Sequence, residues 1–258
     1  MDVRFQWLKP PKGYEWRRFP VTIDGEIRRY WRLVPVSGGR WTDRNDERGL
    51  LKYTPPPGLF RVFARITVSG EYDAVSGEDG GRETGREAIR AFACGYGDIL
   101  VKPHERTDKF VRSKHVKYER RTPEAAWISA IQDMSRAVHL WDETKDATKR
   151  KRAAQVARLA LQSEIRRALT DTDTVMPRFT TADFAPEMTL VMRPANLLAF
   201  MWLSFARVVS GEIEERRCEM FRHCGNYVYI GRGPGLRRGD NSVTCSDKCR
   251  KRKSRGGG

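Results

Sequence analysis

The chain has 258 residues, of which 39% are hydrophobic and 32% are charged, and its formal net charge is +16 at pH 7. This size and composition predict a globular protein with a buried core and argue against a bilayer-spanning chain, because the most apolar run (195–209) is short and interrupted by Ser204 and Arg207. So large a positive charge indicates an anionic polymer as the partner, with anionic lipid or a merely solvated surface as the alternatives.

The charge is concentrated at the two ends of the sequence. Residues 1–70 hold 14 basic and 7 acidic residues, and residues 213–258 hold 12 and 5, whereas the middle of the chain is nearly neutral. We therefore expect an α+β protein in three parts: a basic, aromatic-rich β-containing segment (1–70), a helical body (83–212) and a C-terminal module (213–258). No apolar stretch typical of a secretory signal is visible near residue 1, so we expect a cytoplasmic location and reduced cysteines.

Residues 1–70 contain two β-like runs, 28–36 and 59–68, which predict a small unit of two or three strands. Its aromatic residues alternate with arginines, a pattern that also occurs where proteins stack single-stranded nucleic acid. We favour the simpler interpretation, in which the aromatic rings fill a small core and the arginines face water. The aromatic residues concerned are Trp16, Tyr30, Trp31 and Trp41. Residues 69–83 are rich in turn-forming residues and predict a linker.

Four helices follow. Apolar residues at helical spacing predict the first over about 83–97, and the sequence Thr122-Pro123-Glu124 is a typical helix start for the second. A third helix is expected over about 148–169, with Val156, Leu159 and Ala160 facing inward. Residues 171–194 contain three prolines and predict a loop with one strand. Pro194 is expected to open the last helix, which Gly211 ends.

Four of the five cysteines form two pairs near the C-terminus, Cys218 with Cys224 and Cys245 with Cys249. Two cysteine pairs on separate segments are typical of a structural zinc site with four protein ligands, which leaves no open position for catalysis. Gly225 would allow the tight turn of a metal knuckle. The strand that follows and a helix beginning near Cys249 would complete a knuckle, β-hairpin and helix resembling a treble clef. His223, beside Cys224, is the alternative ligand, and Cys94 is expected in the core.

The same residues resemble the CGNR-type zinc-finger proteins of bacteria. The resemblance rests on the apolar helix ending in "RVVSGEIEERRC", on the Cys-Gly-x-Tyr knuckle at 224–227 and on "CSDKCRKRKSR" at 245–255. It is strong over 194–255 and extends more loosely over 83–255. This chain has Arg250-Lys251-Arg252 where the family has Gly-Asn-Arg after the last cysteine. The family is regarded as DNA-binding regulators, so the resemblance implies one structural zinc ion and a role in transcription regulation.

The segment after the last cysteine is strongly basic and predicts a phosphate-binding helix held rigidly by the metal. We therefore expect a nucleic-acid partner, DNA first and RNA as a possibility, and no membrane partner. The alternatives are a zinc-stabilised protein-interaction or RNA-binding module, and a solvated basic tail. No catalytic motif is present, and we do not expect an enzyme. The oligomeric state is not predicted. The expected phosphate contacts are Arg237, Arg238, Lys248, Arg250, Lys251, Arg252, Lys253 and Arg255.

Overall fold

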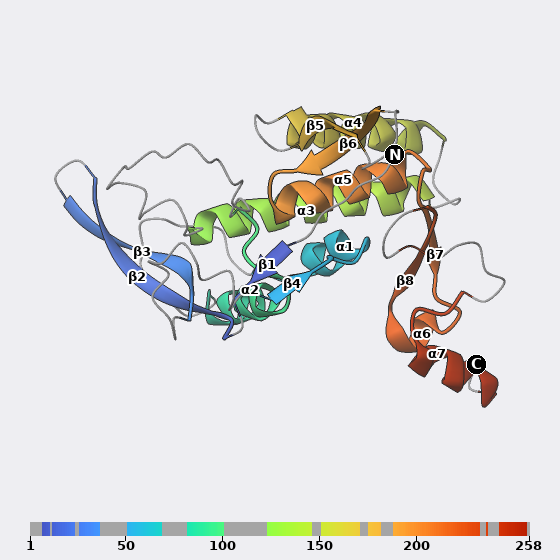
Figure 1. Ribbon diagram of the computed structural model, residues 1–258, viewed down its shortest axis with the longest axis horizontal. Coiled ribbons are helices and arrows are strands. Elements are labelled where there is room, and N and C mark those ends of the chain that lie inside the picture. The colour runs from blue at the N-terminus through green and yellow to red at the C-terminus, as the bar shows by residue number, and fades with distance from the viewer. Residues whose placement is uncertain are drawn as a thin grey trace.

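The computed structural model is an α+β fold in which the described residues form four two-stranded antiparallel sheets and seven helices (Figure 1). This confirms the predicted fold class. The described residues are 7–10, 12–23, 26–36, 51–68, 82–100, 123–145, 151–170, 175–181, 188–232, 236 and 243–256. The predicted linker, apart from the start of the helix that follows it, and Trp41 lie outside them.

Two antiparallel strand pairs form the N-terminal β unit. Strand β1 (Trp7–Lys9) pairs with β4 (Leu51–Tyr53), and β2 (Tyr14–Ile23) forms a hairpin with β3 (Glu26–Pro35). Strand β3 confirms the run predicted at 28–36. Side chains at the base of this hairpin, such as Tyr14 and Leu33, are buried in the main core. Trp31 lies farther out, with the guanidinium groups of Arg18 and Arg86 at 4.7 and 4.6 Å from its ring centroid. The aromatic residues are thus divided between the core and arginine contacts.

The prediction of a strand over 59–68 is wrong, because the first six of these residues form helix α1 (Leu59–Ala64). The helix follows a run of three prolines and Gly58, and its residues Leu59, Phe60 and Phe63 are all fully buried. A short apolar run that is covered on several sides carries no periodicity by which a strand and a helix can be told apart. Tertiary packing therefore decides the conformation of this segment.

The helical body consists of α2 (Arg82–Tyr96), α3 (Glu124–Lys145), α4 (Lys151–Thr170) and α5 (Leu197–Val209). Each confirms a helix expected from the sequence, with ends shifted by a few residues. Together with α1 they enclose one apolar core, in which bulky side chains from different helices meet. Its largest fully buried members include Trp127, Phe60, Phe63, Phe205, Ile89, Ile131 and Met134.

The expected inward face of α4 is wrong. Val156 and Leu159 are each 60% exposed, and Ala160 is exposed as well. The helix instead buries Ala157 and Leu161, which lie one turn apart. Apolar residues occur on more than one side of α4, so spacing alone does not identify the side that packs against α3.

Residues 175–194 form a second departure from expectation. In place of a loop with one strand they contain a hairpin, β5 (Val175–Thr181) paired with β6 (Met188–Pro194). Both strands are edges of a two-stranded sheet, where proline is tolerated because no neighbour needs its missing N–H. Pro194 therefore ends a strand, and α5 begins after Asn196, whose side chain accepts a hydrogen bond from the N–H of Ala199 at 2.8 Å.

Helix α3 links the two basic regions of the molecule. Pro123, immediately before α3, forms a β-bridge with Arg32 of β3, and Lys145 at its end bonds to Glu215 of the C-terminal module. Hairpin β2–β3 and the last helix consequently lie at opposite ends of the long axis (Figure 1). Basic hairpin β2–β3 and basic helix α7 therefore do not share one face. Within the described residues, no helix combines the length and the apolar character needed to cross a bilayer.

Candidate metal centre

The first cysteine pair lies in the turn of a hairpin. Strand β7 (Glu214–Arg217) pairs with β8 (Tyr227–Ile230), and the residues between them form the knuckle, including the short helix α6 (Phe221–Cys224). Gly225 has φ of 62°, a left-handed conformation that a residue with a Cβ adopts only with strain. Because β8 pairs with β7, the hairpin closes directly on the knuckle.

The second cysteine pair lies at the start of helix α7 (Asp247–Ser254). Ser246 caps this helix, since its hydroxyl accepts a hydrogen bond from the N–H of Cys249 at 3.3 Å. Cys245 precedes the cap and Cys249 lies in the first turn. The cap therefore turns both thiols toward the hairpin, as the sequence predicted.

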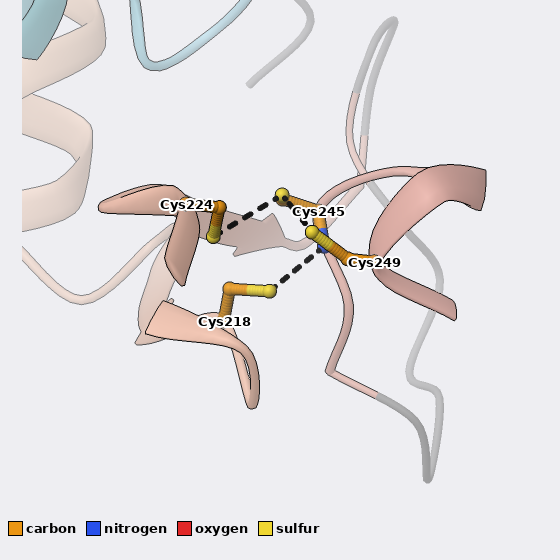
Figure 2. Close-up of side chains that lie close together, drawn as sticks. All are labelled: Cys218, Cys224, Cys245 and Cys249. Atoms are coloured by element: carbon orange, nitrogen blue, oxygen red, sulfur yellow. Dashed lines mark hydrogen bonds between the residues drawn. The ribbon is translucent and has the colours of Figure 1, made fainter. Parts of the chain in front are cut away.

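The four thiols of Cys218, Cys224, Cys245 and Cys249 meet at one point (Figure 2). Their sulfur atoms all lie within 4.8 Å of one another, and Cys245 is 3.7 Å from Cys224 and 3.4 Å from Cys249. A tetrahedral ion bound at about 2.3 Å per sulfur separates its ligand sulfurs by about 3.8 Å. The cluster can therefore hold a single metal ion. His223 is exposed and is not one of this group.

The surroundings of the thiols favour their use as metal ligands. The N–H of Cys245 donates to the sulfur of Cys218 at 3.3 Å, and the N–H of Asn226 donates to that of Cys224 at 3.5 Å. Burial and the neighbouring thiols raise the pKa of Cys245 to about 12, whereas the Ser246 hydroxyl, followed by the neighbouring thiols, lowers the pKa of Cys249. Several thiolates close together repel one another, which opposes their joint ionisation. A bound cation would stabilise the thiolates, so metal binding would release their protons.

Helix α7 carries its cations on two distinct sides. Three of them, together with the C-cap residue that follows the helix, are exposed and have no carboxylate partner among the described residues, and their spacing of i, i+3, i+4 and i+7 places them on one side. Arg250 instead pairs with Asp247, and Lys253 pairs with Glu219, each at 2.9 Å. The predicted Arg237 and Arg238 lie outside the described residues. The four residues, called the α7 cation face below, are Lys248, Lys251, Arg252 and Arg255.

A buried ion-pair network, which the sequence pattern did not predict, lies beside the candidate metal centre. Arg61 of α1 bonds through Nε and Nη2 to both oxygens of Glu215 on β7, at 2.6 and 2.7 Å. It also bonds to both oxygens of Asp142 on α3, at 2.9 and 2.7 Å. Its guanidinium lies 4.1 Å from the ring centroid of Tyr227. A single arginine of α1 thus connects α3 of the helical body to hairpin β7–β8.

Glu215 is the most enclosed member of this network, with a side chain only 1% exposed. It accepts further bonds from Lys145 at 2.8 Å and from the hydroxyl of Tyr229 at 2.9 Å. Burial alone would raise the pKa of Glu215, but Arg61 and then Lys145 hold it at about 2. Burial and the nearby carboxylate raise the pKa of Tyr229 well above its usual range. Glu215 is therefore ionised at neutral pH, and the neutral Tyr229 hydroxyl donates a hydrogen bond to it.

Two further contacts hold the hairpin against α1. Arg65 donates from Nη2 to the carbonyl oxygen of Gly225 in the knuckle at 2.8 Å. Gly58 lies so close to β8 that an added Cβ would overlap the ring of Tyr229. A charged residue inside the apolar run "LFRVFA" was the one indication of this interface in the sequence, since buried charges require partners.

Cys94 lies on α2, away from the cluster, and packs against the main core as predicted. Its sulfur accepts a hydrogen bond from the N–H of Tyr14 at 3.2 Å.

The predicted division into three parts stays a prediction. The Arg61 contacts join all three of these parts. Comparison with models of protein families, with curated proteins and with solved structures found no match to this chain.

Proposed function

We propose that this protein binds nucleic acid, duplex DNA in the first place, through the α7 cation face of a zinc-stabilised module. The observation that carries the proposal is the α7 cation face, whose four exposed cations have no carboxylate partner in the described part of the chain, on a helix whose first turn contains Cys249 of the four-cysteine cluster. Phosphate groups are the natural partners of such a surface, because each contact releases condensed counterions. Four sulfur ligands in a closed set favour zinc in a structural role.

The resemblance of residues 194–255 to the CGNR-type proteins favours DNA over RNA and a role in transcription regulation. Phosphate contacts alone do not distinguish the two polymers, since they carry no base sequence. Arg250 and Lys253 are excluded from the proposed contacts, because both are already paired with carboxylates. The proposed contacts are thus the residues of the α7 cation face, which are fewer than the cations predicted from the sequence.

The test is a fluorescence anisotropy titration of the zinc-loaded chain with labelled duplex DNA, repeated with single-stranded RNA as competitor. We expect DNA binding that is lost in the double variant Lys251→Glu and Arg252→Glu. Binding that is unchanged in this variant would overturn the assignment of the surface. Stronger competition by RNA would reassign the polymer, and the absence of binding to either would favour a protein-interaction module.

A further inference from the structure

Hairpin β7–β8 is held in place at several separate points, and most of them involve helix α1 or the residues that flank it. Arg61 bonds to Glu215 in the middle of β7, and its guanidinium covers the ring of Tyr227 at the start of β8. Arg65 bonds to the carbonyl oxygen of Gly225, between the knuckle and β8. These contacts fix the two strands that flank the knuckle, which contains Cys218 and Cys224.

Arg61 is the central member of these contacts. Its side chain is 6% exposed, so its charge depends on the two carboxylates that face it from different elements. Asp142 belongs to the body and Glu215 to the hairpin. Movement of the hairpin away from α1 would leave Arg61 with one of its two partners and would expose Glu215. The network therefore favours one position of the hairpin over all others.

We propose that Arg61 is a positioning residue of the metal centre, which couples metal binding by the four cysteines to the docking of hairpin β7–β8 on the helical body. The docked hairpin holds Cys218 and Cys224 at the spacing that the metal requires, so the body adds to the affinity of a site it does not line with ligands. Coupling of this kind is reciprocal, and the metal must strengthen the docking by the same factor. The inference does not depend on nucleic-acid binding.

The first experiment measures the rate of zinc release from the loaded full-length chain into an excess of a chromogenic chelator. We expect Arg61→Met to retain one zinc per chain but to release it faster, by a factor within the range of about 5 to 150 that is typical of coupled sites. The matched control is Arg216→Gln, on the same strand β7. Arg216 is exposed, and its one ion pair within the described ranges is with its neighbour Glu214, so its removal should leave the release rate unchanged.

A double-mutant cycle shows whether the effect passes through the ion pair. Arg61 and Glu215 act together. The double variant Arg61→Met and Glu215→Gln should therefore release zinc much more slowly than expected from multiplying the accelerations of the two single variants. Far-ultraviolet circular dichroism of each variant reports whether the helical body remains folded. Equal release rates in wild type and a folded Arg61→Met variant would overturn the proposal.

The second experiment needs no variant and therefore decides the question even if Arg61→Met does not fold. Amide hydrogen exchange is followed in α1 of the wild-type chain with zinc and after its removal by a chelator. Reciprocal coupling predicts faster exchange in residues 59–64 without metal, although none of them is a ligand. A purely structural role of Arg61 would leave exchange in α1 independent of the metal, and this result would also overturn the proposal.

Discussion

The α7 cation face makes a quantitative prediction about salt. Four phosphate contacts, one for each unpaired cation, correspond to a slope of about −3.6 in a plot of log K against log salt, at about −0.9 per phosphate. Affinity for duplex DNA should then fall about 150-fold between about 50 and 200 mM salt. Neutralising Lys251 and Arg252 as Lys251→Gln and Arg252→Gln should reduce the slope to about −1.8 and the loss to about 12-fold.

The structure provides a matched control on the same helix. Arg250→Gln with Lys253→Gln removes the same charge from α7, but from cations already paired with Asp247 and Glu219. This variant should keep a slope near −3.6. The assay is fluorescence anisotropy at four or more salt concentrations. Equal slopes for the two double variants would refute the reasoning, because they would show that the total charge of α7, and not its unpaired side, determines binding.

Three further predictions concern the metal centre and its support. The double variant Cys218→Ser and Cys245→Ser should lose the single metal ion measured by elemental analysis, whereas Cys94→Ser should retain it. Ser246→Ala removes the cap of α7 and should reduce the free energy of unfolding in urea by about 1 kcal/mol. Glu215 has its pKa lowered from 4.5 to about 2, so the stability it contributes is complete above pH 4.5 and is lost as the pH falls through about 2. Glu215→Gln should therefore destabilise the protein by on the order of 3 kcal/mol at pH 7, and this difference from wild type should shrink by about half at pH 3 in urea unfolding experiments.

Features that depend on neighbours in the sequence were predictable. The caps and glycines around the cysteines identified a knuckle and a helix start, and the structure brings the four sulfur atoms together as the spacing suggested. Helix α3 follows from its start at Thr122-Pro123-Glu124 and from its apolar spacing, and it begins at Glu124 as expected. In both cases the structure depends on residues close together in the sequence, whose types and spacing indicate the local conformation.

Features that depend on distant partners were not predictable. Arg61 and Glu215 are separated by 154 positions in the sequence, and nothing local to either indicates that they meet. Leu59–Ala64 became a helix because its apolar residues are covered by α3 and α5, which no local pattern encodes. The exposed side of α4 was assigned inward for the same reason, since Val156 and Leu159 are as apolar as the residues that pack.

Helix α3 also determines how the electric charge of the molecule acts. Its 22 residues span about 33 Å between Arg32 of β3 and Glu215 of β7, whereas the Debye length at physiological ionic strength is about 8 Å. Charges at one end are therefore screened from those at the other. The net charge of +16 does not act as a single field, and an anion near α7 is attracted by the local cations alone. Hairpin β2–β3 and α7 are thus electrically independent, so neutralising the hairpin should leave the attraction at α7 unaltered.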